Sequence, residues 1–119
     1  MNAKTAFRLS AVLGFLAVAL GAFGAHQFKA LLAETGNAAV WQTAALYHLV
    51  HSLVALLLTT REPFARWAWR LFVAGILIFS GSLYALALSN VRALGAITPL
   101  GGLCLLGGWL LLALPGREK

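Results

Sequence analysis

Two tyrosines and three histidines are the side chains of this sequence whose types and spacing could support chemistry. Tyr47 and His51 are four residues apart, as are Ser80 and Tyr84, so each pair would share one face of a helix. His48 and His51 would lie about 60° apart around a helix, which could place them on either side of a metal ion or a haem. These groups could therefore bond to one another or hold a polar ligand.

The sequence lacks the groups on which most chemistry inside membranes depends. The acidic residues Glu34, Glu62 and Glu118 lie outside the apolar segments, which argues against a carboxylate-based pump or cation transporter. Cys104 is the only cysteine, so neither an internal disulfide nor a thiolate metal site is expected. No Walker loop, HExxH or nucleophile motif is present. We therefore expect a protein that is not an enzyme and that has no metal site and no cofactor.

Four segments without Lys, Arg, Asp or Glu contain the polar side chains, and each is long enough to cross a bilayer. A spanning helix needs about 20 mainly apolar residues, because the hydrocarbon interior cannot hydrogen-bond exposed amides. None of the segments alternates with the period of two that a barrel strand requires. The predicted fold class is all-α, a polytopic membrane protein. Residues 1–119 would form a single compact bundle of four transmembrane helices, with spans at about 7–25, 40–60, 67–89 and 97–115.

Composition supports a membrane location. Hydrophobic residues make up 61% and charged residues 10% of the chain, against about 45–50% and about 25% in soluble domains. The net charge of +6 comes from basic residues near segment ends, with no basic helix face, so no nucleic-acid partner is expected. The expected partner is the lipid bilayer, with other membrane subunits or a second copy of the chain as further candidates.

The basic residues predict how the chain is oriented, because short loops rich in Lys and Arg remain cytoplasmic. Seven of them fall on one side and two on the other, so both termini should be cytoplasmic. Trp67 and Trp69 would form an aromatic belt on the cytoplasmic side. Cleavage of the N-terminal segment as a signal peptide is an alternative, but its apolar run exceeds the usual 7–15 residues or so. The seven are Lys4, Arg8, Arg61, Arg66, Arg70, Arg117 and Lys119, and the two are Lys29 and Arg92.

Small residues occur at intervals suited to helix packing. Lipid tails are as apolar as leucine, so membrane helices associate through close contact and interhelical hydrogen bonds. We expect tight contacts at Gly21, Gly24, Gly81, Gly101, Gly102 and Gly108. Thr98 and Pro99 suit the cap and first position of the fourth helix. A short surface helix is expected between Phe28 and Gly36.

The polar side chains concentrate between the midplane and the outer ends of the spans, at 1.5 Å of rise per residue. We expect one cluster between spans two and three, in which His51 hydrogen-bonds to span three and the outer end is closed by His26 and Thr98. Two interpretations remain open: an interhelical hydrogen-bond network, or a pocket for a lipid headgroup, a quinone or a haem. The candidate residues are His26, Tyr47, His51, Ser80, Ser82, Tyr84 and Thr98.

The motifs GAFGAH at 21–26, FSGSLY at 79–84 and TPLGG at 98–102 resemble the domain-of-unknown-function 423 family, whose eukaryotic relatives are similar to transmembrane protein 256. The resemblance implies a small four-span protein of the bacterial inner membrane and no established activity. His48 lies outside the family pattern, which weakens a paired His48–His51 ligand site. Two functions stay open: an accessory or structural membrane subunit, and a redox or transport module that binds a small molecule. The implied signature positions are His26, Tyr47, His51, Ser80, Gly81, Ser82, Tyr84, Thr98 and Pro99.

Overall fold

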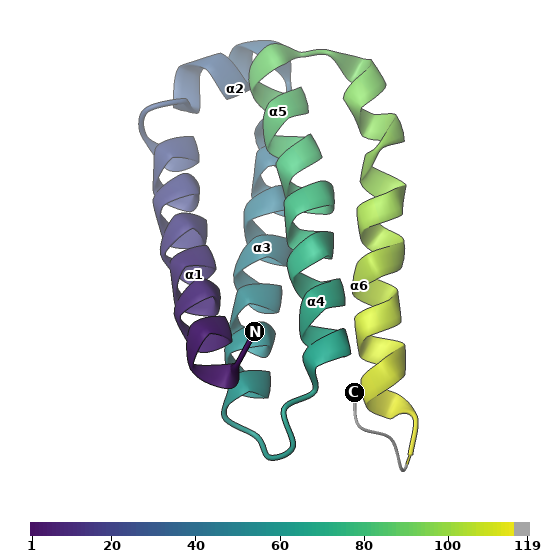
Figure 1. Ribbon diagram of the computed structural model, residues 1–119. Coiled ribbons are helices and arrows are strands. Elements are labelled where there is room, and N and C mark those ends of the chain that lie inside the picture. Colours follow the sequence, from purple (N-terminus) through teal and green to yellow (C-terminus); the bar gives the residue numbers. More distant parts are fainter. Residues whose placement is uncertain (116–119) are drawn as a thin grey trace.

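A computed structural model describes residues 1–115, and this part of the chain is helical throughout apart from short connections (Figure 1). Four stretches are long and apolar enough to cross a membrane: Ala3–Ala25, Ala38–Thr59, Arg66–Ser89 and Arg92–Ala113. The all-α, four-span fold class is therefore confirmed. The first helix starts earlier than expected, because the Asn2 side chain accepts a hydrogen bond from the Thr5 amide at 2.9 Å and caps it.

The first two spans are the single helices α1 (Ala3–Ala25) and α3 (Ala38–Thr59), joined by the short helix α2 (Lys29–Thr35). Gly36 ends α2 in the left-handed conformation, with φ of 74°, which suits glycine because it has no Cβ. The third span consists of α4 (Arg66–Gly75), the π segment η1 (Ile76–Ser80) and α5 (Gly81–Ser89). The fourth begins with the 3₁₀ turn η2 (Arg92–Ala96) and continues as α6 (Thr98–Ala113).

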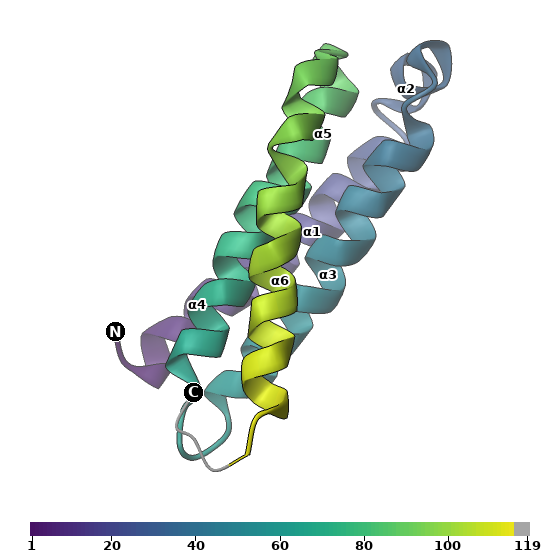
Figure 2. The same cartoon turned by 90° about the vertical axis from the view of Figure 1, so that its right-hand side faces the viewer.

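The helices run alternately up and down, and each packs chiefly on the next one in the sequence. α1 packs on α3, α3 packs on the third span, and α6 packs on α4 and η1 (Figures 1 and 2). The N-terminus, the connection between α3 and α4 and the end of α6 lie at one end, and α2 and η2 lie at the other. Arg117 and Lys119, two of the residues used to predict orientation, lie outside the described residues.

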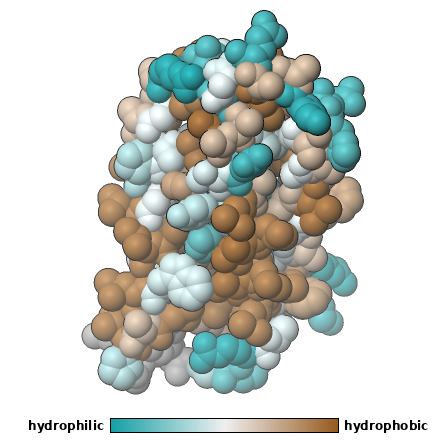
Figure 3. Space-filling view, turned by 180° about the vertical axis from the view of Figure 1, so that it is seen from behind, coloured by the Kyte–Doolittle hydropathy of each residue, from teal (hydrophilic) through white to brown (hydrophobic). Residues whose placement is uncertain are grey.

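Polarity is distributed unevenly along the bundle. Figure 3 shows hydrophobic side chains over most of the lower half of the rear face, above a polar lower rim. The upper part of this face, toward α2, is more polar.

Three of the predicted packing glycines lie where helices touch. An added Cβ at Gly24 would collide with the Trp41 indole, and one at Gly108 would lie 2.7 Å from the Phe72 ring. At Gly101 it would meet the backbone of η1, with the Phe79 Cα at 2.7 Å. Gly102 is looser, because its added Cβ would make ordinary contact with Phe79 at 3.8 Å. Gly75, which the sequence analysis did not select, also packs tightly, against Leu105.

The expectation of tight packing is wrong for Gly21 and Gly81. A Cβ added at either position would meet no atom within 4 Å. α1 has one main transmembrane neighbour, so only a narrow stripe of its surface is covered, and Ala17 rather than Gly21 occupies that stripe. Gly81 borders a hollow between α1 and the third span. Glycine spacing marks one face of a helix but does not identify what that face meets.

The predicted aromatic belt is wrong for one of its two tryptophans. Trp67 is 60% exposed, and the Arg70 guanidinium lies 4.6 Å from its ring centroid. Trp69 is only 4% exposed and donates a hydrogen bond from Nε1 to the Ser10 hydroxyl at 2.8 Å. Residues two apart on a helix lie about 160° apart around its axis, so Trp67 and Trp69 occupy opposite sides of α4, one exposed and one in the core.

Candidate functional site

The polar residues expected to form one cluster form two, on different sides of α3. Tyr84 approaches His48, whereas Tyr47 and His51 face α6. His48 and His51 therefore do not jointly hold one ligand. We call the first group, with Trp41, His48 and Tyr84, the His48 cluster. We call the second, with Tyr47, His51 and Trp109, the His51 cluster.

The His48 cluster joins α1, α3 and α5. The His48 Nδ1 and the Tyr84 hydroxyl are 2.9 Å apart, and the Tyr84 ring lies 4.7 Å from the Trp41 ring between centroids. Trp41 in turn donates from Nε1 to the Leu20 carbonyl oxygen at 2.8 Å. The indole can reach this carbonyl because Gly24, one turn further along α1, has no side chain in its way. The glycine in the GAFGAH motif thus makes room for a tryptophan two helices along the chain.

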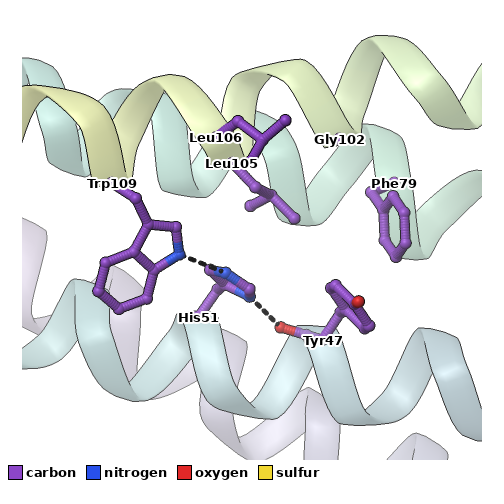
Figure 4. A pocket seen from close by; sticks show the side chains of 7 residues that line it. All are labelled: Tyr47, His51, Phe79, Gly102, Leu105, Leu106 and Trp109. Carbon is purple, nitrogen blue, oxygen red and sulfur yellow. Dashed lines mark hydrogen bonds between the residues drawn. The ribbon is translucent and has the colours of Figure 1, made fainter.

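Both ring nitrogens of His51 are occupied in the His51 cluster (Figure 4). The Trp109 Nε1–H donates to His51 Nε2 at 3.1 Å, so Nε2 carries the lone pair. His51 Nδ1 lies 2.7 Å from the Tyr47 carbonyl oxygen, which can only accept, so Nδ1 carries the proton. This pattern requires a neutral imidazole in one tautomer. No lone pair remains for a metal ion or a haem iron.

The prediction that His51 would hydrogen-bond to span three is wrong. Its partner is Trp109 of α6, and its contact with the third span is to the Phe72 ring at 5.7 Å between centroids. Equal depth in the membrane does not decide which neighbouring helix a side chain meets. The sequence did contain a signal, because Trp109 is an indole donor in an otherwise aliphatic segment and needs an acceptor when it is not in water.

Ser80, Ser82 and Thr98 tie the helices together outside both clusters. The Ser80 hydroxyl donates to the Ala44 carbonyl oxygen of α3 at 2.7 Å. The Ser82 and Thr98 hydroxyls are 2.6 Å apart and link α5 to α6. Thr98 is therefore not the cap expected from the sequence, since it is the first residue of α6 and its hydroxyl bonds across helices. These serines and Thr98 stabilise the bundle.

His26 does not close the outer end of either cluster. It is exposed at the C-terminal end of α1, where its backbone amide donates to the Ala22 carbonyl oxygen at 3.0 Å. The buried polar side chain at this end is that of Asn37, which the sequence analysis did not single out. Its side-chain amide donates to the Ala87 carbonyl oxygen and to Asn90 Oδ1, both at 3.2 Å. Asn90 ends α5 in the left-handed conformation. Asparagine adopts this conformation more readily than most residues, so Asn90 was the signal in the sequence that could have located the end of α5, where Asn37 binds.

A hollow of about 380 Å³ lies between α3 and α6 beside the His51 cluster (Figure 4). We call it the α3–α6 hollow. Residues 1–115 contain no group of three or more His, Cys, Asp or Glu side chains that could hold a metal ion. The hollow is thus suited to an uncharged, largely apolar occupant. The side chains around it include Tyr47, His51, Phe79, Leu105, Leu106 and Trp109.

Comparison with known proteins agrees with this membrane architecture. Residues 20–102 match a family described as "Protein of unknown function (DUF423)". The chain is 42% identical over 110 residues to a UPF0382 membrane protein of Staphylococcus epidermidis, covering 89% of each chain. It is 40% identical over 113 residues to a UPF0382 membrane protein of Bacillus subtilis, covering 89% of this chain and 90% of the relative.

A relative also occurs in yeast. A UPF0382 membrane protein of Schizosaccharomyces pombe is 35% identical over 112 residues, which cover 88% of this chain and 95% of the relative. No solved structure matches the chain. The matched region, 20–102, contains Trp41, His48, His51 and Tyr84, so most of the two clusters lies inside the family's shared segment. This chain therefore belongs to the DUF423, or UPF0382, family of multi-pass membrane proteins.

Proposed function

We propose that this protein is a non-enzymatic accessory subunit of a larger membrane complex, located in the bacterial cytoplasmic membrane with both termini in the cytoplasm. Most of the side chains that could have done chemistry hydrogen-bond across helices, to other side chains or to backbone carbonyls. His51 uses both ring nitrogens, and the Ser80, Ser82 and Thr98 hydroxyls bond between spans. Such bonds contribute about 0.6 kcal/mol each on average in membranes, which is enough to fix helix register.

The observation that carries this proposal is a groove of about 180 Å³ between α1 and α3. We call it the α1–α3 groove; its surface is formed by the small residues Ser10, Ala11, Gly14 and Ser52 with leucines of α3 beside them. A Cβ added at Gly14 would meet nothing within 4 Å. Small residues let the backbones of two membrane helices approach closely, so the groove suits a helix of a partner protein.

A second feature of the α1–α3 groove points to a partner. The Ser52 side chain is only 2% exposed, yet its hydroxyl has no hydrogen-bond partner within residues 1–115. A buried hydroxyl without a partner is unfavourable by about 1–3 kcal/mol in protein mutational data. A docked helix that shifts α1 slightly would offer it a backbone carbonyl. α1 is also an edge helix, with Phe15 72% exposed.

The test is a substitution that changes the α1–α3 groove without touching the bundle. Gly14→Leu should not lower the melting temperature, because a Cβ added at Gly14 would meet nothing within 4 Å and leucine favours the helix over glycine. It should also abolish the higher-mass species of the tagged chain on native gels of mildly solubilised membranes. Gly81→Leu is the matched control, since its Cβ is equally open but it lies on α5. A wild-type chain that migrates as a monomer, or an unaffected Gly14→Leu complex, would contradict the proposal.

A cross-linking experiment in the α1–α3 groove distinguishes a different partner protein from a second copy of this chain. In a Cys104→Ser background, Ala11→Cys should not form a disulfide-linked dimer if the groove binds a different protein. Two differently tagged copies expressed together should then fail to purify with each other. Dimers formed through Ala11→Cys would instead identify the partner as a second copy of the chain.

A second candidate function, binding of a small molecule, is favoured by the α3–α6 hollow of about 380 Å³. Pockets for small ligands typically enclose about 300–1,000 Å³. Of the ligands considered from the sequence, haem fits poorly, because His51 has no free nitrogen for the iron. A quinone or a lipid remains. An optical spectrum of the purified protein should lack haem absorption, and a haem band would reverse this choice.

A further inference from the structure

We propose that the α3–α6 hollow binds a lipid-soluble, uncharged molecule with a flat ring and a carbonyl oxygen, a quinone-type headgroup, through the Tyr47 hydroxyl. This proposal rests on the small-molecule role described above and is independent of the α1–α3 groove. It assigns the hydrogen bond with the ligand to Tyr47, and it selects a quinone over a lipid.

Tyr47 supplies the hydrogen-bond donor. The side chain is 42% exposed beside the hollow, and within residues 1–115 its cross-turn bond to His51 uses the backbone carbonyl, not the hydroxyl. Tyr47 is nine residues into α3, about 14 Å along a helix that is about 33 Å long. The Tyr47 backbone therefore lies near the middle of the span and its hydroxyl within the hydrocarbon, where water cannot bond to it. An acceptor on a ligand would satisfy it.

The rings around the α3–α6 hollow favour a flat occupant. The Tyr47 ring lies 4.7 Å from the Phe79 ring and 5.9 Å from the His51 ring between centroids. The Trp109 ring lies 5.9 Å from the His51 ring. Aromatic rings attract one another in offset or edge-to-face arrangements at about 4.5–7 Å. A conjugated ring would gain these contacts, whereas a saturated acyl chain would not.

The other residues around the hollow favour a ligand without charge. The residues lining it include no Lys, Arg, Asp or Glu, so a charged headgroup would find no counter-charge. The His51 and Trp109 nitrogens already bond to each other, which leaves Tyr47 as the donor. A single donor can bond to one of the two ring carbonyls of a quinone, and the neutral ring needs no counter-charge.

A carbonyl could also come from the ester of a phospholipid, but its depth does not match. Ester groups lie at the edges of the hydrocarbon core, which is about 30 Å thick. Tyr47 lies within a few ångströms of the middle of α3 on the same helix geometry. An ester would have to be drawn about two helical turns into the core to reach the level of the Tyr47 backbone. The ring carbonyl of a mobile, membrane-soluble molecule has no such constraint.

The experiment uses the full chain in lipid vesicles and decylubiquinone as the probe. Saturable quenching of tryptophan fluorescence is expected, because Trp109 lines the hollow, and Trp109→Phe should remove most of the saturable signal. Tyr47→Phe should weaken the apparent Kd about tenfold, the effect of losing about 1.4 kcal/mol. Tyr84→Phe is the matched control, because its hydroxyl bonds to His48 in the other cluster and the affinity should not change.

A variant that narrows the hollow provides an independent check. Gly102→Val should weaken saturable binding, because its side chain takes up part of the hollow, and it should fold, since a Cβ there makes only ordinary contact at 3.8 Å. Its melting temperature reports on folding. Equal affinity for wild type and Tyr47→Phe, or an unchanged Kd in folded Gly102→Val, would overturn the proposal. The small-molecule role itself would stand if a native ligand still co-purified with Tyr47→Phe.

Whether the acceptor carbonyl instead belongs to a phospholipid ester is tested by changing the lipids of the vesicles. Ether-linked phospholipids lack ester carbonyls, so a quinone site should give the same Kd in ether-linked and ester-linked vesicles. Markedly tighter quinone binding in ether-linked vesicles would mean that an ester normally competes for the Tyr47 hydroxyl. That result would assign the site to phospholipid and overturn the quinone assignment.

Discussion

At the scale of single residues, His51 shows how far spacing predicts a site. The four-residue interval correctly places Tyr47 and His51 on one face, and the rings lie stacked at 5.9 Å. The interval cannot reveal that the bond to Tyr47 uses the backbone carbonyl or that Trp109, 58 positions away in the sequence, supplies the second bond. The structural role of His51 thus depends on a long-range contact that local sequence does not specify.

The bond between His51 and Trp109 should make a measurable contribution to stability. His51→Leu and Trp109→Phe each remove one partner, and the double variant should be less unstable than the sum of the single effects predicts. The coupling energy should be about 0.6 kcal/mol, the average for hydrogen bonds between membrane helices, and at most about 1.7 kcal/mol. The measurement is a double-mutant cycle of unfolding in detergent. Strictly additive effects would mean that the bond is not formed in the folded protein.

At the scale of helices, the sequence predicts the elements better than their contacts. Charge-free runs identify all four spans, because membrane length and backbone hydrogen bonding leave few alternatives. The π segment η1 has no such signal, since its residues Ile76–Ser80 are compatible with an α-helix. It lies where the Gly101 backbone approaches η1. Packing across helices therefore determines this local conformation, and packing was not available from the sequence.

The two kinds of glycine should respond oppositely to alanine. Gly101→Ala forces a methyl group against the Phe79 backbone and should destabilise the bundle by about 1–3 kcal/mol. Gly21→Ala meets nothing within 4 Å and should be neutral or stabilise the helix by up to about 1 kcal/mol. Melting temperatures in the same detergent compare the two. A destabilised Gly21→Ala variant would show that Gly21 contacts another helix in the measured state.

At the scale of the whole molecule, the bundle has two inner and two outer helices. Within their most apolar windows, α1 and the span ending in α6 are each 17% buried, against 33% for α3 and 39% for the third span. The outer helices therefore present most of their surface to lipid or to partners. This arrangement explains why both the α1–α3 groove and the α3–α6 hollow open at the flanks of the bundle, where α1 and α6 leave α3 partly uncovered.

Orientation can be tested with two exposed acidic positions at opposite ends of the bundle. In a Cys104→Ser background, Glu34→Cys on α2 should react with an impermeant thiol reagent added to intact cells. Glu62→Cys, between α3 and α4, should react only after the membrane is opened. Glu34 is preferable to Gly36, whose φ of 74° would strain a cysteine. The opposite labelling pattern would place both termini outside the cytoplasm.

The π segment also determines how insertions and deletions in this family should be interpreted. A π turn accommodates one residue more than the corresponding α-helical turn. Deleting one residue between Ile76 and Ser80 would convert the π turn to an α turn and leave the orientation of α5 relative to α4 almost unchanged. Tyr84 would then still face His48, and Ser82 would still face Thr98. A deletion elsewhere in the third span would instead rotate α5 by about 100°. A one-residue gap at the π segment in a homologue is therefore compatible with the same interior, whereas a gap within α4 or α5 marks a rebuilt one.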